Sequence, residues 1–382
     1  MPAPTPTPTL GVAISAIRRD ASPASSTTVA PTNINTETIQ YITILGITDD
    51  HVTLQPQTID LGPTCVQTIA PDANGYVPPG TCGAIWDYYP SFAAALLFAG
   101  LFGTLTLLHI WQAARYKKRF CWVIIMAAIW ETLAFTFRAL SAKHQQSDGI
   151  YLVFQIFILL APLWVNAFDY MVLGRMIYYF LPSRSLFSVP APIIAALFVS
   201  LDFVSFIVQL VGGSTAGPNS SPADQLKAIH VYMGGIGIQQ GFIVIFLSLA
   251  IGFQMEMSTL SRAVTTTLHP GHQWAPLLMT LYASLALITV RIIFRLIEFS
   301  RGDDVSNPIL THEAYFYLLE ATPMFFAILS FNITHPGRVL VGPEAEMPGF
   351  IATVKGLLRQ AKTRQDWKEV DSGDEMQAMQ PR

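Results

Sequence analysis

Seven long runs of apolar residues, separated by short polar stretches, dominate the chain between residues 89 and 337. Each run is long enough to cross a bilayer as a helix, which takes about 20 residues. The pattern therefore predicts an all-α membrane protein built as a seven-transmembrane helix bundle. We place the spanning helices at about 90–113, 120–142, 150–176, 188–211, 229–254, 274–299 and 314–334.

The segments on either side of this membrane domain (89–337) have a different pattern. Residues 1–88 are rich in Thr, Pro and Ser, which predicts a partly disordered extracellular region. If this region lies outside the cell, Cys65 and Cys82 are candidates for a disulfide, with two free or buried thiols as the alternative. In the tail (338–382), residues 348–364 have apolar and basic positions at helical spacing. They indicate either an amphipathic helix on an anionic membrane surface or a weakly structured tail.

Basic residues in the short loops set the expected orientation, because cytoplasmic loops carry an excess of Lys and Arg. The odd-numbered loops hold six such residues and the opposite loops hold three. The N-terminus is therefore expected outside the cell and the C-terminus in the cytoplasm. In that orientation Asn219, in the sequon Asn219-Ser220-Ser221, lies outside and is a candidate for glycosylation. The six basic residues are Arg115, Lys117, Lys118, Arg119, Arg184 and Arg262, and the three are Lys143, Lys227 and Arg301.

Composition narrows the classes of function. The 382 residues are 52% hydrophobic and 12% charged, whereas soluble domains have about 25% charged residues. A net charge of −3 without a clustered basic face argues against a nucleic-acid partner. No Gly-x-x-x-x-Gly-Lys-Ser/Thr motif is present, so we expect no ATP-driven transport by this chain alone. The histidines fall on both sides of the expected topology, so we expect no metal and no cofactor.

Polar side chains inside the apolar runs are the candidate functional residues. Such groups are costly at membrane depth and normally face the bundle interior or a wet cavity. Arg291, Arg295 and Glu298 follow i, i+4, i+7 spacing and share one helical face. Helical rise places most of these groups at one level, between the bilayer midplane and the outer surface. The candidate ligand-binding residues are Glu131, Arg138, Gln155, Asp202, Gln209, Arg291, Arg295, Glu298 and Glu320.

One structural explanation stands beside a binding site. Glu131 and Asp202 would each form a helix-bridging ion pair with an arginine, which is compatible with a ligand cavity. With Asp169 included, the acids exceed the arginines by two. This excess suits a cationic head group, a proton or protonated acids.

Prolines and glycines modify the expected helices. Pro162 and Pro323 lie near the centres of their runs, where proline removes a backbone hydrogen bond and kinks a helix. The backbone carbonyls that lose this hydrogen bond would line a site, or the kinks would only shape helix packing. Four glycines in the fifth run predict a small-residue surface for close helix packing. They are Gly234, Gly235, Gly237 and Gly241.

Different short motifs follow one another in a fixed order along the seven runs. They are Tyr89-Pro90-Ser91, Glu131 with Arg138, Gln155, Leu160-Ala161-Pro162, Tyr170, Gly174-Arg175, Asp202, Ser205, Gln209, Gly212-Gly213, Gly237, Gln239, Arg291, Arg295, Glu298, Gly302, Glu313, Tyr317, Pro323 and His335-Pro336-Gly337. In this order they resemble the fungal RTA-like family, the lipid-translocating exporters named for resistance to aminocholesterol. The chain departs from the family where Ala93-Ala94-Ala95 replaces a usual asparagine and where Glu320 replaces a usual aspartate.

The resemblance implies a fungal plasma-membrane protein. Relatives are linked to export or flipping of sphingoid long-chain bases, to resistance to toxic amphiphiles and, in one branch, to porphyrin uptake. We therefore expect a translocator of amphipathic lipids, or a binder that promotes translocation, rather than an enzyme. Its expected partners are membrane lipids and an amphipathic small molecule, with a homo-oligomer left open.

Residue roles follow from this hypothesis. Glu131, Asp202 and Glu320 would hold a cationic head group. Three arginines would balance charge or bind a phosphate or hydroxyl: Arg138, Arg291 and Arg295. A seven-helix lipid or stress receptor or sensor is the alternative function. A third function is a membrane zinc hydrolase that uses histidines such as His269 and His272. The structural alternative is that His269-Pro270-Gly271-His272 is only a loop turn.

Overall fold

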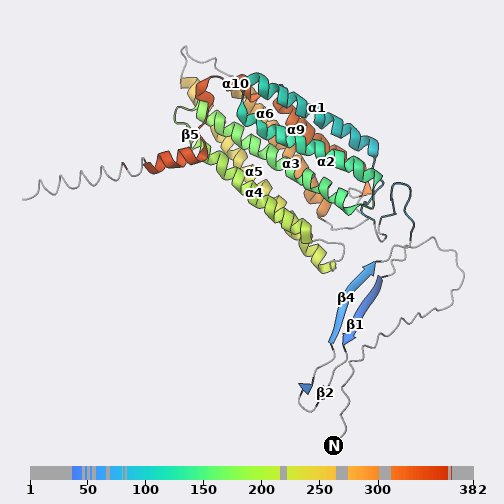
Figure 1. Cartoon of the computed structure of the whole chain (residues 1–382). Coiled ribbons are helices and arrows are strands. Elements are labelled where there is room, and N and C mark those ends of the chain that lie inside the picture. Colours follow the sequence, from blue (N-terminus) through green and yellow to red (C-terminus); the bar gives the residue numbers. More distant parts are fainter. Residues whose placement is uncertain are drawn as a thin grey trace, which may run out of the picture.

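The computed structural model confirms the predicted all-α seven-span architecture (Figure 1). Seven of its helices are long and apolar enough to cross a membrane. The structure describes residues 69–79, 81, 84–215, 222–263, 274–300, 311–359 and 363, and the backbone of 37–44, 48–49, 52–53 and 57–65. The side chains of Cys65 and Cys82 lie outside this part, as do Asn219 and the pair His269 and His272. The disulfide and the glycosylation therefore stay predictions.

Six of the spans are single helices and the seventh is composite. The single helices are α1 (Phe92–Tyr116), α2 (Trp122–Lys143), α3 (Asp148–Phe180), α4 (Ala191–Thr215), α5 (Pro222–Ala263) and α6 (Trp274–Phe299). The seventh span consists of α8 (Glu313–Phe316), the π-helical turn η2 (Tyr317–Ala321) and α9 (Thr322–Ile333). A short helix, α10 (Pro336–Val339), follows it.

Short elements connect or flank these helices. Strand β1 (Glu37–Ile44) pairs antiparallel with β4 (Gln57–Cys65), and β2 (Thr48–Asp49) pairs with β3 (Val52–Thr53). The composition of residues 1–88 did not predict these strands. Another small hairpin, β5 (Ser185–Leu186) with β6 (Val189–Pro190), joins α3 to α4. The 3-10 turns η1 (Arg119–Cys121) and η3 (Pro343–Ala345) precede α2 and follow α10.

The helix ends follow local capping chemistry more than the edges of the apolar runs. Ser91 Oγ accepts the Ala94 N–H at the start of α1, and Lys117 ends that helix in the left-handed region with φ of 53°. Helix α5 runs for 42 residues, about 63 Å, well beyond the predicted 229–254. Hydropathy marks only the part of a helix that lies in lipid, so polar extensions such as that near Arg262 are not visible in it.

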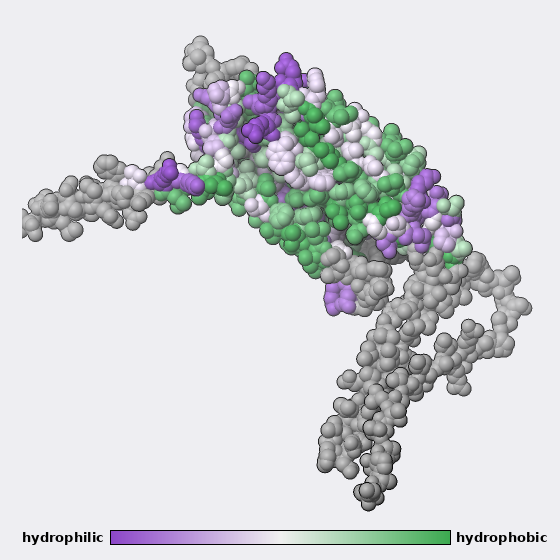
Figure 2. All heavy atoms as spheres, in the orientation of Figure 1, coloured by the Kyte–Doolittle hydropathy of each residue, from purple (hydrophilic) through white to green (hydrophobic). Residues whose placement is uncertain are grey.

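The outer surface of the bundle is apolar. Figure 2 shows hydrophobic residues across the middle of the bundle and hydrophilic residues towards its two ends. Large apolar side chains that would be buried in a soluble protein are exposed there, as expected for contact with lipid. Examples are Leu96, Leu97, Leu107, Val204 and Ile245.

Helices α4 and α5 approach closely at two glycines. A Cβ on Gly212 would lie 2.5 Å from the Tyr232 backbone nitrogen, and one on Gly235 would lie 2.7 Å from Gln209 Cγ. The expected four-glycine surface is therefore wrong in extent. The other three glycines of the expected surface (Gly234, Gly237 and Gly241) would meet no atom within 4 Å. Helical periodicity turns these three away from α4.

The neighbouring glycines Gly235 and Gly234 provide a matched test of this contact. Gly235→Ala is expected to lower the free energy of unfolding by about 1–3 kcal/mol, because the added methyl overpacks a backbone contact. Gly234→Ala is expected to leave it unchanged or raise it by up to about 1 kcal/mol, because alanine favours a helix. Thermal unfolding of the purified variants in detergent measures both changes. A loss of similar size in both variants would contradict the close approach at Gly235.

The tail forms a helix over residues 350–359. Its large apolar side chains Phe350, Ile351, Leu357 and Leu358 are exposed. This agrees with a helix inside the predicted range 348–364. Its position on a membrane surface stays a prediction.

Candidate functional site

Five of the candidate residues lie in one buried cluster between α2, α6 and the seventh span, which we call the arginine–glutamate cluster. Glu320 accepts from Arg291 Nε at 2.7 Å and from Arg295 Nε at 2.9 Å, one arginine on each carboxylate oxygen. Arg295 Nη1 also donates to Glu298 at 2.9 Å. Glu131 is the fifth member, and its charge interacts with those of Arg291, Glu320 and Arg295. The Glu320 side chain is 0% exposed, and those of Arg291 and Arg295 are 7% and 6% exposed, so the two ion pairs of Glu320 are buried.

The π-helical turn places Glu320 opposite the two arginines. Pro323 has no N–H, and directly before it the backbone widens into η2. The N–H of Thr322 bonds the carbonyl of Tyr317, five residues back, and the Thr322 hydroxyl bonds the same oxygen at 2.8 Å. The sequence predicted a kink at this proline. The sequence did not indicate the extra residue in this π-helical turn. That residue rotates Glu320 towards α6.

The second proline supplies an acceptor to the same cluster. Pro162 lies inside α3 and cannot donate to the carbonyl of Ile158, four residues earlier. Arg291 Nη2 donates to that carbonyl at 3.3 Å. Two roles were expected for the freed carbonyls, to line a site or to reflect kinks that only shape packing. The Ile158 carbonyl has the first role, because it lines the arginine–glutamate cluster.

Glu131 differs from the other acids of the cluster. It is fully buried, and neither carboxylate oxygen has a hydrogen-bond partner among the described residues. Arg295 Nη2 is also without a partner there. The two arginines already balance Glu298 and Glu320, so an ionised Glu131 adds one unbalanced negative charge. A bare carboxylate in such a site costs several kcal/mol, on the order of the penalty for a buried ion, so it calls for a proton or a cationic group.

Arg138 lies in a separate aromatic cage. It donates to Glu313 at 2.9 Å, to the Tyr88 hydroxyl at 2.9 Å and to the Tyr317 hydroxyl at 3.1 Å. The other Glu313 oxygen accepts the N–H of Ser91 at 2.8 Å, which ties the start of α1 to the seventh span. Five rings lie 4.0–5.9 Å from the guanidinium carbon, those of Trp86, Tyr88, Phe154, Phe316 and Tyr317.

These contacts make Arg138 a structural residue in this conformation. Its side chain is 1% exposed and ion-paired. Burial raises the pKa of Tyr88, so the phenol stays neutral and accepts from the arginine. Glu313 was absent from the candidate residues because it lies at the polar edge of its apolar run, where a carboxylate is unremarkable.

Asp202 belongs to a third polar group, formed with α3. One of its oxygens accepts from Asn166 at 2.8 Å and from the Tyr170 hydroxyl at 2.9 Å. Asp169 accepts from Ser284 at 2.8 Å and interacts electrostatically with Asp202. No Lys or Arg forms an ion pair with either acid in the described part of the chain. The i, i+3, i+4 spacing of Asn166, Asp169 and Tyr170 was the signal in the sequence that could have found this group.

The remaining candidates form local pairs. Gln209 donates to Gln239 at 2.9 Å, joining α4 to α5, and Gln155 donates to the Tyr151 hydroxyl at 2.6 Å. The nine candidates thus occupy several neighbouring groups and not a single cavity. Ion pairs do bridge helices as the structural explanation required, but their acids are Glu313 and Glu320, not Glu131 and Asp202.

Histidines in the described residues serve local contacts. His109 Nε2 lies 3.2 Å from the carbonyl oxygen of Ile328, and His335 Nδ1 accepts the Gly337 N–H at 3.0 Å. His335 thereby caps α10. Among the residues that the structure describes, no three His, Cys, Asp or Glu side chains form a group that could hold a metal ion.

Comparison with known proteins adds independent information. A family model described as RTA1 like protein matches residues 124–342. A probable lipid transporter, atnI of Emericella nidulans, is 48% identical over 291 residues, which are 75% of this chain and 76% of that protein. The lipid-translocating exporter-like protein RTA1 of Leptosphaeria maculans is 30% identical, over 68% of this chain and 52% of its own length.

A third relative is more distant. The sphingoid long-chain base transporter RSB1 of Saccharomyces cerevisiae is 26% identical over an aligned length of 279 residues, and the match covers 65% of this chain and 72% of that protein. No solved structure matches the chain.

Proposed function

The chain belongs to the RTA1-like protein family, and on that premise we propose that it translocates amphipathic lipids across a membrane, with sphingoid long-chain bases as the substrate class. The names of three relatives support lipid translocation, and one of them specifies sphingoid bases. A sphingoid base presents an ammonium group and hydroxyls at the end of a long apolar chain. The site must therefore offer one anionic acceptor and neighbouring hydroxyl partners.

The observation that carries this proposal is the unpartnered carboxylate of Glu131 in the arginine–glutamate cluster. The ammonium group of the lipid would supply the positive charge and the N–H donors that Glu131 lacks. The free Nη2 of Arg295 would donate to a hydroxyl of the same head group. Glu320 holds the two arginines and does not contact the lipid. This revises the expected role of Glu320.

Asp202 takes second place as an ammonium acceptor. One of its oxygens is already occupied by Asn166 and Tyr170. Together with Asp169, Asp202 would form a second binding position for the head group, on the α3–α4 side of the bundle. Because Glu131 is fully buried, the head group reaches it only when helices separate, as in a protein that alternates between open and closed states.

A liposome experiment tests the function and the site together. Purified full-length chain in phosphatidylcholine liposomes, without ATP, is expected to accelerate transbilayer movement of a fluorescent sphingosine. Glu131→Gln is expected to slow this movement at least about tenfold, because it removes the charge-assisted contact to the ammonium. Glu256→Gln is the matched control, since it makes the same chemical change on an exposed side chain of α5.

The outcomes separate the proposals. Equal rates in Glu131→Gln and the wild type, with equal incorporation, would place the binding site elsewhere. No acceleration by the wild-type chain, with saturable binding of the labelled lipid, would favour a lipid receptor or sensor.

We also propose the plasma membrane as the location, with the N-terminus outside, on the basis of the loop charges. Protease protection of tagged termini in intact cells tests that orientation.

A further inference from the structure

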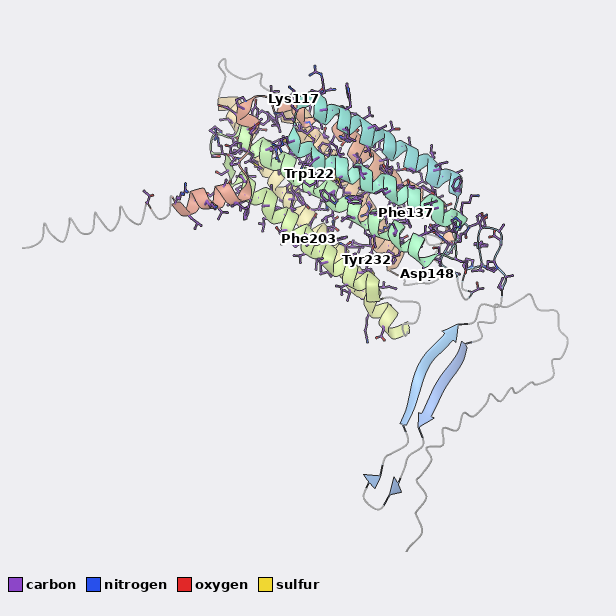
Figure 3. All side chains as sticks on the ribbon, in the orientation of Figure 1. Lys117, Trp122, Phe137, Asp148, Phe203 and Tyr232 are labelled. Carbon is purple, nitrogen blue, oxygen red and sulfur yellow. The ribbon has the colours of Figure 1, made fainter. Side chains whose placement is uncertain are left out.

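An open pocket of about 570 Å³ lies on the outside of the bundle, beside the start of α2 and the last turns of α3. It is separate from the arginine–glutamate cluster in the interior. Figure 3 shows Trp122 at the start of α2, towards the end of the bundle that carries Lys117. The pocket is lined by Arg119, Phe120, Trp122, Met171 and Arg175.

The pocket is cationic, and its charge is not neutralised within the described residues. Arg175 stacks on the Phe120 ring, with its guanidinium carbon 4.0 Å from the ring centre, and Nη1 donates to the Met171 carbonyl at 3.2 Å. These two contacts hold the guanidinium in place and leave its other N–H groups free. Neither Arg175 nor Arg119 forms an ion pair with a carboxylate in the described part of the chain. The two arginines are therefore available for an anion.

The surface next to the two arginines, towards the middle of α3, is apolar and aromatic, and we call it the apolar strip. Trp164, Met171 and Arg175 are spaced i, i+7, i+11 and share one face of α3. Trp164 lies about 16 Å along the helix from Arg175, towards the middle of the span. Trp122 is 53% exposed, and its ring meets the Trp164 ring edge-on at 5.2 Å. Tryptophan is enriched at the level of lipid head groups, which fits the place of Trp122 at the start of α2.

We propose that this pocket binds an anionic phospholipid, with the phosphate on Arg119 and Arg175 and an acyl chain along Met171, Trp122 and Trp164. Arginine recognises phosphate through paired N–H donors. A soluble phosphate compound would use the arginines but not the apolar strip, so the strip favours a lipid. The basic loop next to the pocket would concentrate anionic lipid around it. This inference does not depend on the translocation proposal, because the residues and the ligand charge are different.

The test uses full-length purified chain and phosphatidic acid as the probe. Binding is measured by native mass spectrometry during titration with dioleoyl phosphatidic acid, and phosphatidylcholine is titrated in parallel. We expect saturable binding of phosphatidic acid with little retention of phosphatidylcholine. In Arg119→Gln/Arg175→Gln the Kd for phosphatidic acid is expected to rise at least about tenfold, because charge-assisted bonds to the phosphate are lost.

Arg184→Gln is the matched control. It removes the same charge just beyond the end of α3, where Arg184 donates to Tyr178 and does not line the pocket. Its Kd is expected to match that of the wild type. The single variant Arg119→Gln changes an exposed side chain and is expected to fold even if the double variant does not. It should still weaken binding.

Three results would overturn the proposal. The first is unchanged binding of phosphatidic acid in Arg119→Gln and in the double variant. The second is an equal loss in Arg184→Gln, which would indicate general charge attraction. The third is displacement of the lipid by an equal concentration of glycerol 3-phosphate, which would assign the pocket to a soluble phosphate compound.

Discussion

Glu320→Ala is expected to lower the free energy of unfolding of the membrane domain by about 3–5 kcal/mol, or to prevent its accumulation, because it leaves two buried arginines without their shared partner. Glu320 is 0% exposed and bonds Arg291 and Arg295 through separate oxygens. Arg295 keeps its bond to Glu298, whereas Arg291 keeps only the Ile158 carbonyl. Thermal unfolding in detergent, together with the yield of membrane-inserted protein, measures the effect.

Glu320→Asp is the control for this prediction. It keeps the charge and shortens the side chain, and aspartate is the usual residue in the family that the sequence resembles. We expect it to retain most of the stability, with a loss below about 1.5 kcal/mol, as for a modest change in a buried side chain. If Glu320→Ala were as stable as Glu320→Asp, the arginines would have to find other partners, and the buried cluster described above would be wrong.

Arg138→Ala is expected to cost about 3–5 kcal/mol, because it removes one partner of a largely buried ion pair and the cation inside an aromatic cage. The substitution leaves Glu313 facing the hydroxyls of Tyr88 and Tyr317 without a positive charge. Arg138→Lys keeps the charge but cannot form the same planar set of bonds, so an intermediate loss is expected. The transition temperatures of the three proteins in one detergent test this order.

A double-mutant cycle separates the ion pair from the cage. Glu313→Gln alone is expected to destabilise less than Arg138→Ala, because glutamine keeps an amide oxygen that can accept from Arg138, and the guanidinium keeps its bonds to the hydroxyls of Tyr88 and Tyr317. In Arg138→Ala with Glu313→Gln, no unpaired charge remains, and the combined loss is expected to be smaller than the sum of the two single losses. Strict additivity would show that the two residues do not stabilise each other.

The architecture could be predicted from the sequence because lipid imposes a simple requirement. Any segment that crosses the bilayer must satisfy its own backbone hydrogen bonds and present apolar side chains for about 20 residues. The bounds predicted for the sixth span are therefore those of α6 (Trp274–Phe299). The shared face of Arg291, Arg295 and Glu298 followed from helical periodicity alone, since it depends on spacing within one helix.

The partners across helices could not be predicted in the same way. Helix rotation and depth decide which polar groups meet, and these depend on packing that periodicity does not contain. Glu131 and Glu320 both have buried carboxylates, yet only Glu320 reaches the two arginines, because η2 rotates it. Glu313 was named in the motif order of the resemblance but not as a site residue, because a carboxylate near a helix end carries no sign of burial. Strand β1 was missed although five of its eight residues are β-branched, because the Thr-, Pro- and Ser-rich composition of the whole segment 1–88 hid this local signal.

Arg291 connects the two helices that proline interrupts. Its guanidinium bonds the Ile158 carbonyl that Pro162 leaves free in α3, and it bonds Glu320 in the widened turn before Pro323. A bend at either proline changes the distance to this shared side chain and strains or breaks a bond at the other. The backbone beside one proline is therefore joined to the backbone beside the other through a single side chain. Separation of the seventh span from α6 should be an all-or-none event, not a gradual loosening of one helix.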